Sequence, residues 1–412
     1  MGAFNKADLI AEVKKTVSDS VDLGKDISDE EIRELITNIV FEKSKQIYLT
    51  VSEKKEICEA VFNSMRRLDI LQPIIDDPSV TEIMINGAED IFIERDGRTE
   101  QLNEKFESSQ KLEDVIQSIV SKVNRTVNEA SPIVDARLSD GSRVNVVLPP
   151  IALNGPIMTI RKFPEKPMTI ERLINFGSLT EETAKVLEKM VQAKYNIFIC
   201  GGTGSGKTTF LNALSNFIPK DERIITIEDS AELQITGIKN IVKMETRNAN
   251  TEGKGEITIR DLIKASLRMR PERIIVGEVR GAEALDMLQA MNTGHDGSLS
   301  TGHANSSKDM LSRLETMVLS GAIMPLEAIR QQIASAIDIM VHLGRIRDKS
   351  RKVLEITEVL DYKEGNIQLN TLYEFIEEGE TKDGKVMGSL RRTDNEMVNT
   401  LKFKMAGVSD KV

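Results

Sequence analysis

The sequence predicts a protein of the α/β class in three parts: a small helical bundle, an α+β domain, and a larger domain of alternating strands and helices. Three observations lead to this prediction. Apolar residues recur at helical spacing over residues 1–68. Short strand-like runs, separated by Asn-Gly and Asp-Gly pairs, fill residues 69–165. Over residues 166–378, apolar runs alternate with helical segments, as in a sheet covered by helices.

The length and composition agree with several domains and disfavour some classes of protein. The chain has 412 residues, enough for two to three domains with cores of their own. Its net charge of -10 disfavours non-specific binding to nucleic acid. With two cysteines, Cys58 and Cys200, neither a disulfide framework nor a four-cysteine zinc site is supported. No apolar run is long enough to span a bilayer, and the first residues lack the apolar core of a signal peptide.

Residues 1–68 predict a module of three amphipathic helices. Apolar residues recur at helical spacing in the stretches 10–17, 32–40 and 57–68. Ser28, with Glu31 three residues later, is typical of a capping box and predicts the start of the second helix. The module serves either to bind a partner or to pack on the next domain, and the pattern leaves both open.

Residues 69–165 predict strands with one helix among them, Leu112–Val123. Arg137 and Arg143 flank the Asp140-Gly141 turn, and Arg161 ends the last strand, so three cations are expected near one edge. They either serve an anionic ligand or are solvated surface charge. The expected strands are Val80–Ile85, Ile91–Glu94, Ile133–Leu138, Val144–Leu148 and Ile157–Arg161, with turns at Asn86-Gly87, Asp96-Gly97 and Asp140-Gly141.

Pro164 and Pro167 predict a linker before the larger domain. Thr180 is expected to cap a helix that ends at Ala193. After residue 378 the chain is polar and rich in glycine, so residues 379–412 are expected to form a weakly ordered tail. The expected strands are Ile197–Cys200, Arg223–Glu228, Ile241–Met244, Ile274–Gly277, Ser298–Thr301 and Ile339–Leu343, with a strand pair near 352–376; helices are expected at 207–217, 258–268, 281–291, 305–319 and 325–337.

A glycine-rich loop joins the first strand of this domain to the following helix. Its glycines allow backbone amides to surround a triphosphate, and the helix start points its positive dipole end at the same place. Lys207 is expected to reach the β- and γ-phosphates, Thr208 to hold Mg²⁺ through its hydroxyl, and Thr209 to lie near the α-phosphate. The alternative is a glycine-rich turn without a ligand. The residues that complete the pattern GxxxxGK[ST] and its flank are Gly201, Gly202, Thr203, Gly204, Ser205, Gly206, Lys207, Thr208 and Thr209.

Two glutamates follow strands that end at the same edge of the expected sheet. Hydrolysis of ATP requires a metal ion, a positioned water and cations where charge develops. Glu278 ends an apolar strand, which predicts the acid that holds the Mg²⁺ shell, while Gly277 stands where many such proteins carry aspartate. Glu228 ends the other strand and is expected to be the general base. The alternative is that Glu228 is a surface residue and that Asp229 caps a helix or turn.

Two of the three histidines, His295 and His303, flank one strand-like segment. Zinc binding would need more nitrogen or sulfur ligands nearby than the sequence offers. We expect the two imidazoles to sense the γ-phosphate, because they can hydrogen-bond phosphate oxygens or hold the catalytic carboxylates. His342 lies in an apolar run and is expected to be structural.

Together these motifs resemble the secretion ATPase superfamily of type II and type IV secretion and type IV pilus systems. The resemblance covers about residues 70–376 and includes the glycine loop, the acidic box 225–229, the strand 270–281 and the histidine box to Asn305, in this order. The stretches 287–298 and 135–143 are most similar to the CpaF/TadA branch, which powers Flp (Tad) pili. Gly302 departs from the larger apolar residue of many relatives, and the CxxC pairs of zinc-bearing relatives are absent.

The resemblance implies a RecA-like nucleotide-binding domain preceded by the α+β domain and the helical bundle. It also implies a homo-hexameric ring with ATP and Mg²⁺ between the amino-terminal and RecA-like domains, and with Arg137, Arg143 or Arg161 acting on the phosphate. Such an ATPase would lie at the cytoplasmic face of the membrane and drive a pilus or secretion system through an inner-membrane platform protein.

Two alternatives stay open beside this interpretation. One is a RecA-like motor on DNA, which the acidity and the few aromatic residues disfavour. The other is a nucleotide-gated scaffold with little hydrolysis, which Glu228 and Glu278 disfavour.

Overall fold

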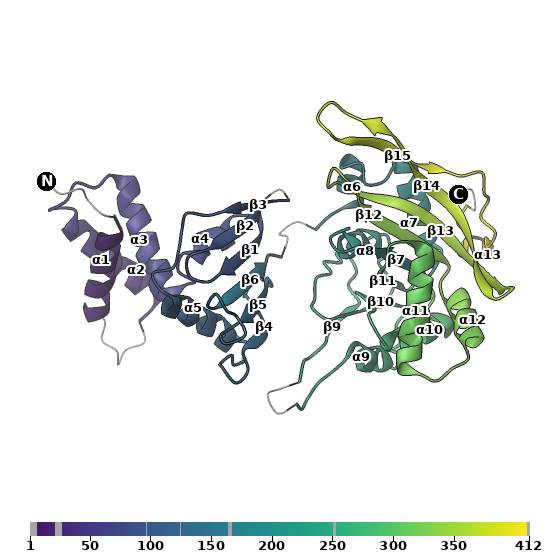
Figure 1. The fold of residues 1–412 in the computed structure, drawn as a ribbon, viewed down its shortest axis with the longest axis horizontal. Helices are drawn as coiled ribbons and strands as arrows, with labels where there is room; N and C mark the ends of the chain where they lie inside the picture. The colour runs from purple at the N-terminus through teal and green to yellow at the C-terminus, as the bar shows by residue number, and fades with distance from the viewer. Residues whose placement is uncertain are drawn as a thin grey trace. The chain divides into compact units, whose positions relative to one another are not determined.

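The computed structural model describes residues 6–20, 27–95, 97–123, 125–163, 167–249 and 253–409. The chain divides into two compact units, residues 1–165 and 166–412 (Figure 1). Each unit has apolar cores of its own. Of the residues that predict a linker, Pro167 lies within these ranges. Pro164 lies outside them, as does Asp96 of one predicted turn.

The described part of residues 1–68 contains the three predicted helices. They are α1 (Lys6–Ser20), α2 (Asp29–Lys43) and α3 (Val51–Arg66), and their buried faces share one apolar core. The predicted capping box begins α2, because the side chains of Ser28 and Glu31 each accept the other's backbone N–H. Thr50 and Glu53 form the same arrangement at the start of α3.

An antiparallel sheet in the order β3-β2-β1-β6-β5-β4 completes the amino-terminal unit. Its strands are β1 (Val80–Asn86), β2 (Ile91–Arg95), β3 (Arg98–Gln101), β4 (Ile133–Arg137), β5 (Arg143–Val147) and β6 (Ile157–Arg161). The helices α4 (Leu71–Asp76) and α5 (Ser109–Lys122) share a core with this sheet. The sequence predicts α5 and all the strands except β3, and it does not predict α4.

A sheet in the order β15-β14-β13-β12-β7-β11-β10-β8-β9 forms the centre of the carboxyl-terminal unit. From β12 to β9 all neighbouring strands are parallel, so β7, β8, β10 and β11 end at one edge. In open α/β sheets this carboxyl edge is where ligands bind. The parallel strands are β7 (Ile197–Gly201), β8 (Ile224–Glu228), β9 (Ile241–Glu245), β10 (Arg273–Val276), β11 (Leu299–His303) and β12 (Ile339–Arg345), and β13 (Arg351–Lys363) follows as a hairpin.

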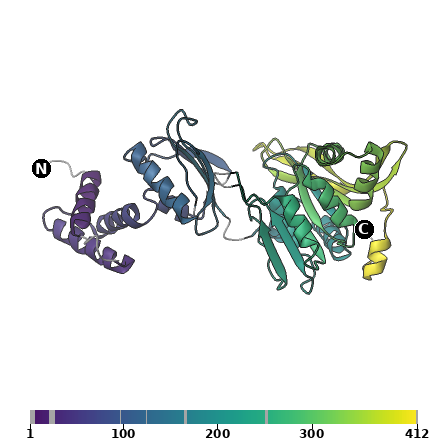
Figure 2. The same cartoon turned by 90° about the horizontal axis from the view of Figure 1, so that it is seen from below.

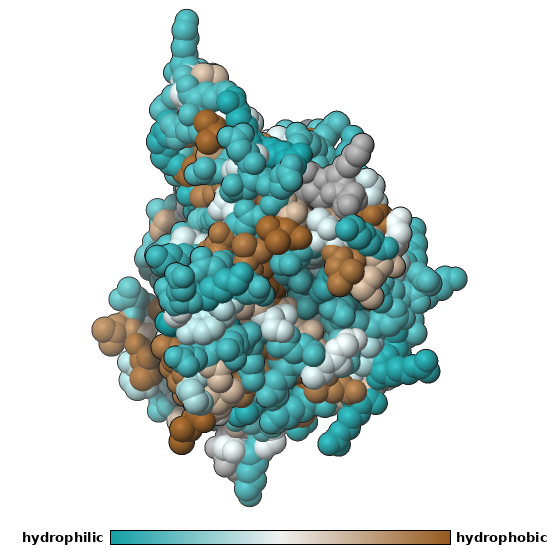
Figure 3. Space-filling view, turned by 90° about the vertical axis from the view of Figure 1, so that its right-hand side faces the viewer, coloured by the Kyte–Doolittle hydropathy of each residue, from teal (hydrophilic) through white to brown (hydrophobic). Residues whose placement is uncertain are grey.

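Helices cover both faces of this sheet (Figures 1 and 2). One face packs with α6 (Ile170–Asn175), α7 (Glu181–Gln192) and α8 (Lys207–Ser215), and the other with α9 (Ile259–Ser266), α10 (Glu283–Asn292), α11 (Ser307–Gly321) and α12 (Leu326–Ala336). The face in Figure 3 is mostly hydrophilic, with apolar side chains in separate patches. Within the described ranges, no helix combines the length and the apolar character needed to cross a lipid bilayer.

The segment after residue 378 forms regular structure, so the prediction of a weakly ordered tail is wrong. The strand β14 (Asn366–Glu380) pairs with β15 (Val386–Arg392), and the helix α13 (Leu401–Ala406) follows. The buried carboxylate of Glu358 accepts the N–H groups of Val398 and Asn399 at 3.0 and 2.7 Å. Phe403 is buried with its ring 4.8 Å from that of Tyr195. These partners are distant in sequence, and a local pattern of polar residues does not reveal them.

Candidate functional site

The glycine-rich loop lies between the buried strand β7 and α8, as predicted. Gly204 and Gly206 have φ angles of +72° and +92°, a region that glycine adopts without steric cost. A Cβ atom on Gly201 would lie 2.3 Å from the carbonyl oxygen of Leu343, so no side chain fits there. The start of α8 has no side-chain cap, and its first N–H groups can therefore bind an anion.

Lys207 is buried, and its ammonium group has two partners within the same unit. Nζ donates to the carbonyl oxygen of Gly202 at 3.1 Å and lies 3.2 Å from Nδ1 of His303. Burial lowers the pKa of Lys207, and the carboxylate of Glu278 acts in the opposite direction. The ammonium group is thus held beside the loop by weak neutral partners that a phosphate oxygen can replace.

Glu278 lies between His303 and Arg280, just beyond the end of β10. Its Oε2 accepts a hydrogen bond from Nη2 of Arg280 at 2.7 Å. Its Oε1 is 2.8 Å from Nε2 of His303, but the atoms are not aligned as a hydrogen bond, and Oε1 is buried without a partner of that kind. Burial lowers the pKa of His303, which favours the neutral imidazole. With Lys207 donating to Nδ1, the neutral ring carries its proton on Nε2, near Oε1 of Glu278 but not aligned with it.

Glu228 is buried at the end of β8, and one of its carboxylate oxygens is unpartnered. Oε1 accepts the N–H groups of Glu232 and Leu233 at 2.8 and 3.0 Å, while Oε2 has no hydrogen-bond partner. Burial raises the pKa of Glu228 to about 7. A Cβ atom on Gly277 would lie 3.1 Å from Cγ of Glu228, so an aspartate at position 277 would crowd the glutamate. The glycine therefore leaves room for the buried carboxylate of Glu228.

Thr208 and Glu278 offer the oxygen ligands that Mg²⁺ prefers. The buried, unpartnered Oε1 of Glu278 fits the role of a ligand or of an acceptor for metal-bound water. Among the described residues, no group of three or more His, Cys, Asp or Glu side chains forms a metal site. A protein contribution of one hydroxyl and one carboxylate agrees with the way Mg²⁺ binds beside phosphates, where waters and phosphate oxygens complete its shell.

The structure separates the two histidines that the sequence predicts to act together. His303 ends β11 and pairs in register with Gly201, at the carboxyl edge. His295 precedes β11 at the opposite edge, where its Nδ1 lies 3.1 Å from the carbonyl oxygen of Ala290. The prediction that both imidazoles face the phosphates is therefore wrong for His295 within one chain.

Gly302, which departs from the family pattern, is explained by its neighbours. A Cβ atom there would lie 2.8 Å from Cε of Met310 and 3.0 Å from Cε1 of Phe198. These two side chains occupy the space of the larger apolar residue, so His303 keeps its place at the strand end.

A hollow of about 240 Å³ opens beside the start of the loop and the end of β11. His303 contributes to it, and its lining is otherwise polar on the side of α11. The residues that line the hollow are Gly202, Thr203, His303, Ala304, Asn305, Asp309 and Arg313.

Cys200 lies one residue before the loop, where burial raises the pKa of the thiol to about 12 and keeps it unreactive.

Arg137, Arg143 and Arg161, which the sequence predicts near one edge, lie in one row across neighbouring strands. Arg137 pairs with Arg143 across the β4–β5 hairpin, and Arg143 pairs with Arg161 of β6. Asp140 fixes the hairpin tip by accepting the N–H and hydroxyl of Ser142 at 2.9 and 2.8 Å. Like charges in register repel, so an anion in front of this row would be stabilised.

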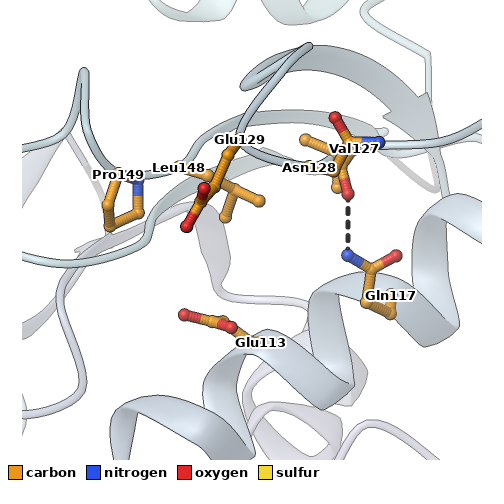
Figure 4. A pocket seen from close by; sticks show the side chains of 7 residues that line it. All are labelled: Glu113, Gln117, Val127, Asn128, Glu129, Leu148 and Pro149. Atoms are coloured by element: carbon orange, nitrogen blue, oxygen red, sulfur yellow. Dashed lines mark hydrogen bonds between the residues drawn. The ribbon is translucent and has the colours of Figure 1, made fainter.

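A second cavity, of about 260 Å³, lies in the amino-terminal unit (Figure 4). The carboxylates of Glu113 and Glu129 lie in its wall, and the amide of Gln117 donates to the carbonyl of Val127 at 2.8 Å. No residue of the predicted site lines this cavity, so it is not part of the candidate active site.

Sequence reasoning missed two groups of arginines around the site. Nη2 of Arg280 donates to Glu278, and Nη1 lies 3.4 Å from Oδ2 of Asp229. The position of Arg280 two residues after Glu278 was a signal in the sequence for the contact with Glu278. Arg345 and Arg351 lie on the β12–β13 hairpin, and Arg351 donates to the carbonyl of Gly204 at 2.8 Å. No local motif marks this pair, because Gly204 of the loop lies 147 residues before Arg351.

Comparisons with known proteins identify the family of this chain. Residues 65–386 match the family model described as "Type II/IV secretion system protein". The conjugal transfer protein TrbB of Rhizobium radiobacter is 33% identical over 73% of this chain and 90% of its own length. The type IV secretion system protein VirB11 of Brucella suis is 32% identical over 67% of this chain and 84% of its own length.

A solved structure supports the fold. The pilus retraction motor PilT with bound ADP aligns with a TM-score of 0.52 at 19% identity, over 82% of this chain and 87% of that chain. The matched family model includes residues of both units, from the last turn of α3 to the first residue of β15. This chain therefore belongs to the type II/IV secretion system protein family.

Proposed function

We propose that this protein is an Mg²⁺-dependent ATPase that powers the assembly of a type IV-like (Flp/Tad) pilus or the secretion of substrates through a membrane platform. The observation that carries the proposal is the meeting of the glycine-rich loop with Glu228, Glu278 and His303 at one edge of the sheet. Relatives named for conjugal transfer and type IV secretion support a role in a secretion or transfer system.

In this proposal the loop amides and Lys207 bind the triphosphate, with Nζ of Lys207 exchanging Gly202 for a phosphate oxygen. Thr208 and Glu278 would hold Mg²⁺, which would supply positive charge beside the phosphates. Glu228 takes a proton from the attacking water, because its pKa of about 7 suits a base at neutral pH. His303 contacts both Lys207 and Glu278. Loss of the γ-phosphate would therefore change the surroundings of both nitrogens of its ring.

We further infer that six copies form a ring on an inner-membrane platform protein at the cytoplasmic face of the membrane. Binding of ATP would close the α+β domain on the nucleotide, and Arg137, Arg143 or Arg161 would then act on the γ-phosphate. Opening after hydrolysis would perform the mechanical work.

Replacement of Lys207 tests the site directly. Lys207→Ala is expected to reduce ATP hydrolysis to background, since the loop loses its only cation. The measurement is release of inorganic phosphate from ATP with Mg²⁺, and Lys239→Ala, an exposed lysine of the same unit, is the matched control. Turnover by Lys207→Ala near the wild-type rate would refute the assignment. Stimulation of the wild type by single-stranded DNA would instead favour a nucleic-acid motor.

A further inference from the structure

The β12–β13 hairpin contacts the outside of the glycine-rich loop. Nε of Arg351 donates to the carbonyl oxygen of Gly204 at 2.8 Å. Its stem follows the same stretch of loop, because a Cβ atom on Gly206 would lie 3.3 Å from Cδ of Arg351. Arg345 pairs with Arg351 across the hairpin, and its Nη1 is 4.0 Å from the position of a Cβ atom on Gly204.

The hydrogen bond from Arg351 fixes the orientation of the peptide group between Gly204 and Ser205. In a trans peptide the carbonyl and the next N–H point to opposite sides. The carbonyl of Gly204 points toward Arg351, so the N–H of Ser205 points to the other side of this peptide. There it donates to the carbonyl oxygen of Gly202, with 3.3 Å between nitrogen and oxygen. Gly204 itself, with φ of +72°, has more conformations open to it than other residues and gains most from a fixed partner.

The charges on the hairpin also distinguish these arginines from their neighbour. Arg347, in the same turn, forms ion pairs with Glu377 and Glu380. In the part of the chain that the structure describes, Arg345 and Arg351 make no ion pair with a carboxylate, although they face each other in register. Two like charges held together beside a phosphate-binding loop are a favourable environment for an anion.

We propose that Arg351 is a positioning residue for the glycine-rich loop: it holds the Gly204–Ser205 peptide so that the loop is shaped for a triphosphate before the nucleotide arrives. This inference rests on the proposed ATPase function. Without Arg351 the loop would have to be ordered on binding, which weakens affinity for the nucleotide. The reacting groups would stay in place, so the Michaelis constant KM should rise while the turnover number kcat stays close to wild type.

The test compares Arg351→Ala with Arg347→Ala, which removes the same charge from the same turn. Steady-state hydrolysis gives KM and kcat, and titration of the full chain with a fluorescent ADP analogue gives Kd. Arg351→Ala is expected to raise KM and Kd about three- to tenfold, as loss of one charge-assisted hydrogen bond predicts. Arg351→Lys, which keeps the charge but lacks Nε, should raise both by less. Arg347→Ala should leave both within twofold of wild type.

Three outcomes would overturn the proposal. The first is an unchanged KM and Kd in both Arg351 variants. The second is an equal effect of Arg347→Ala. The third is a loss that disappears at high salt and is matched by Arg345→Ala, because it would assign the effect to charge alone. If wild type itself fails to bind or hydrolyse ATP, the proposed function fails instead, so the two failures are distinguishable.

Discussion

Glu228 is a carboxyl group whose burial and reactivity are linked. Glu228→Gln is expected to keep nucleotide affinity and lose turnover, because an amide retains the shape but cannot accept a proton. Wild-type kcat should rise with pH through about 7 and level off above it, since the base must be ionised. The measurement is kcat and Kd from pH 5.5 to 8.5. A variant that keeps most of its turnover, or loses affinity instead, would contradict the role of base.

The same variant gives a second readout that needs no ATP. Because the pKa of folded Glu228 lies above the ordinary 4.5, the folded state binds more protons between pH 4.5 and about 7. The free energy of unfolding should therefore fall as the pH rises through this window, by about 3 kcal/mol for this group. Glu228→Gln should lack this pH dependence, so the difference in unfolding free energy between wild type and variant should change with pH across the window. Glu256→Gln, at an exposed position, is the control.

At the residue scale, the sequence predicts what a local motif determines. The loop residues and Glu228 follow strands directly, and the structure places them at one edge. His295 lies eight residues before His303, but spacing alone cannot tell that the strand between them puts the two at opposite edges. The sequence does not explain why position 277 has glycine where many such proteins carry aspartate. The structure does, because a Cβ atom there would lie 3.1 Å from Cγ of Glu228.

Among the elements, α13 is the one that the sequence conceals most. Phe403→Ala is expected to destabilise the carboxyl-terminal unit by about 3–4 kcal/mol, because a fully buried aromatic ring is lost. Urea unfolding followed by circular dichroism measures the change. Met405→Ala, at an exposed position of the same helix, should alter stability by about 0.5 kcal/mol or less. Equal effects of the two variants would mean that α13 does not pack as described.

Elements with their own caps and periodicity were predictable, and those held by remote partners were not. Thr180 begins α7 and Thr258 begins α9, each through a capping box within four residues. By contrast, Tyr195 binds the carbonyl oxygen of Asn399 at 2.6 Å across about 200 residues of chain. Long-range contacts of this kind give a polar segment its structure without leaving a periodic signal.

At the scale of the whole molecule, the proposed mechanism depends on the row of Arg137, Arg143 and Arg161. Replacing the one that acts on the γ-phosphate by alanine is expected to lower kcat by about 10³–10⁵ while changing Kd little, as for other arginine fingers. Each variant is assayed separately for turnover and nucleotide affinity, at one protein concentration because assembly affects the rate.

Arg98→Ala, on β3 of the same sheet, is the control for the loss of a surface cation. If all three variants keep kcat within about threefold of wild type, less than the roughly 1.4 kcal/mol of a tenfold change, the row is surface charge and has no catalytic role.

The burial of Cys200 makes the proposed closure of the two units testable with fluorescent dyes. Its thiol pKa of about 12 should protect it from maleimide dyes at neutral pH. With Cys58→Ser, a cysteine introduced at the exposed Arg98 and another at the exposed Met405 would carry a donor and an acceptor dye on the two units. Energy transfer between the dyes would then follow each cycle of nucleotide in real time.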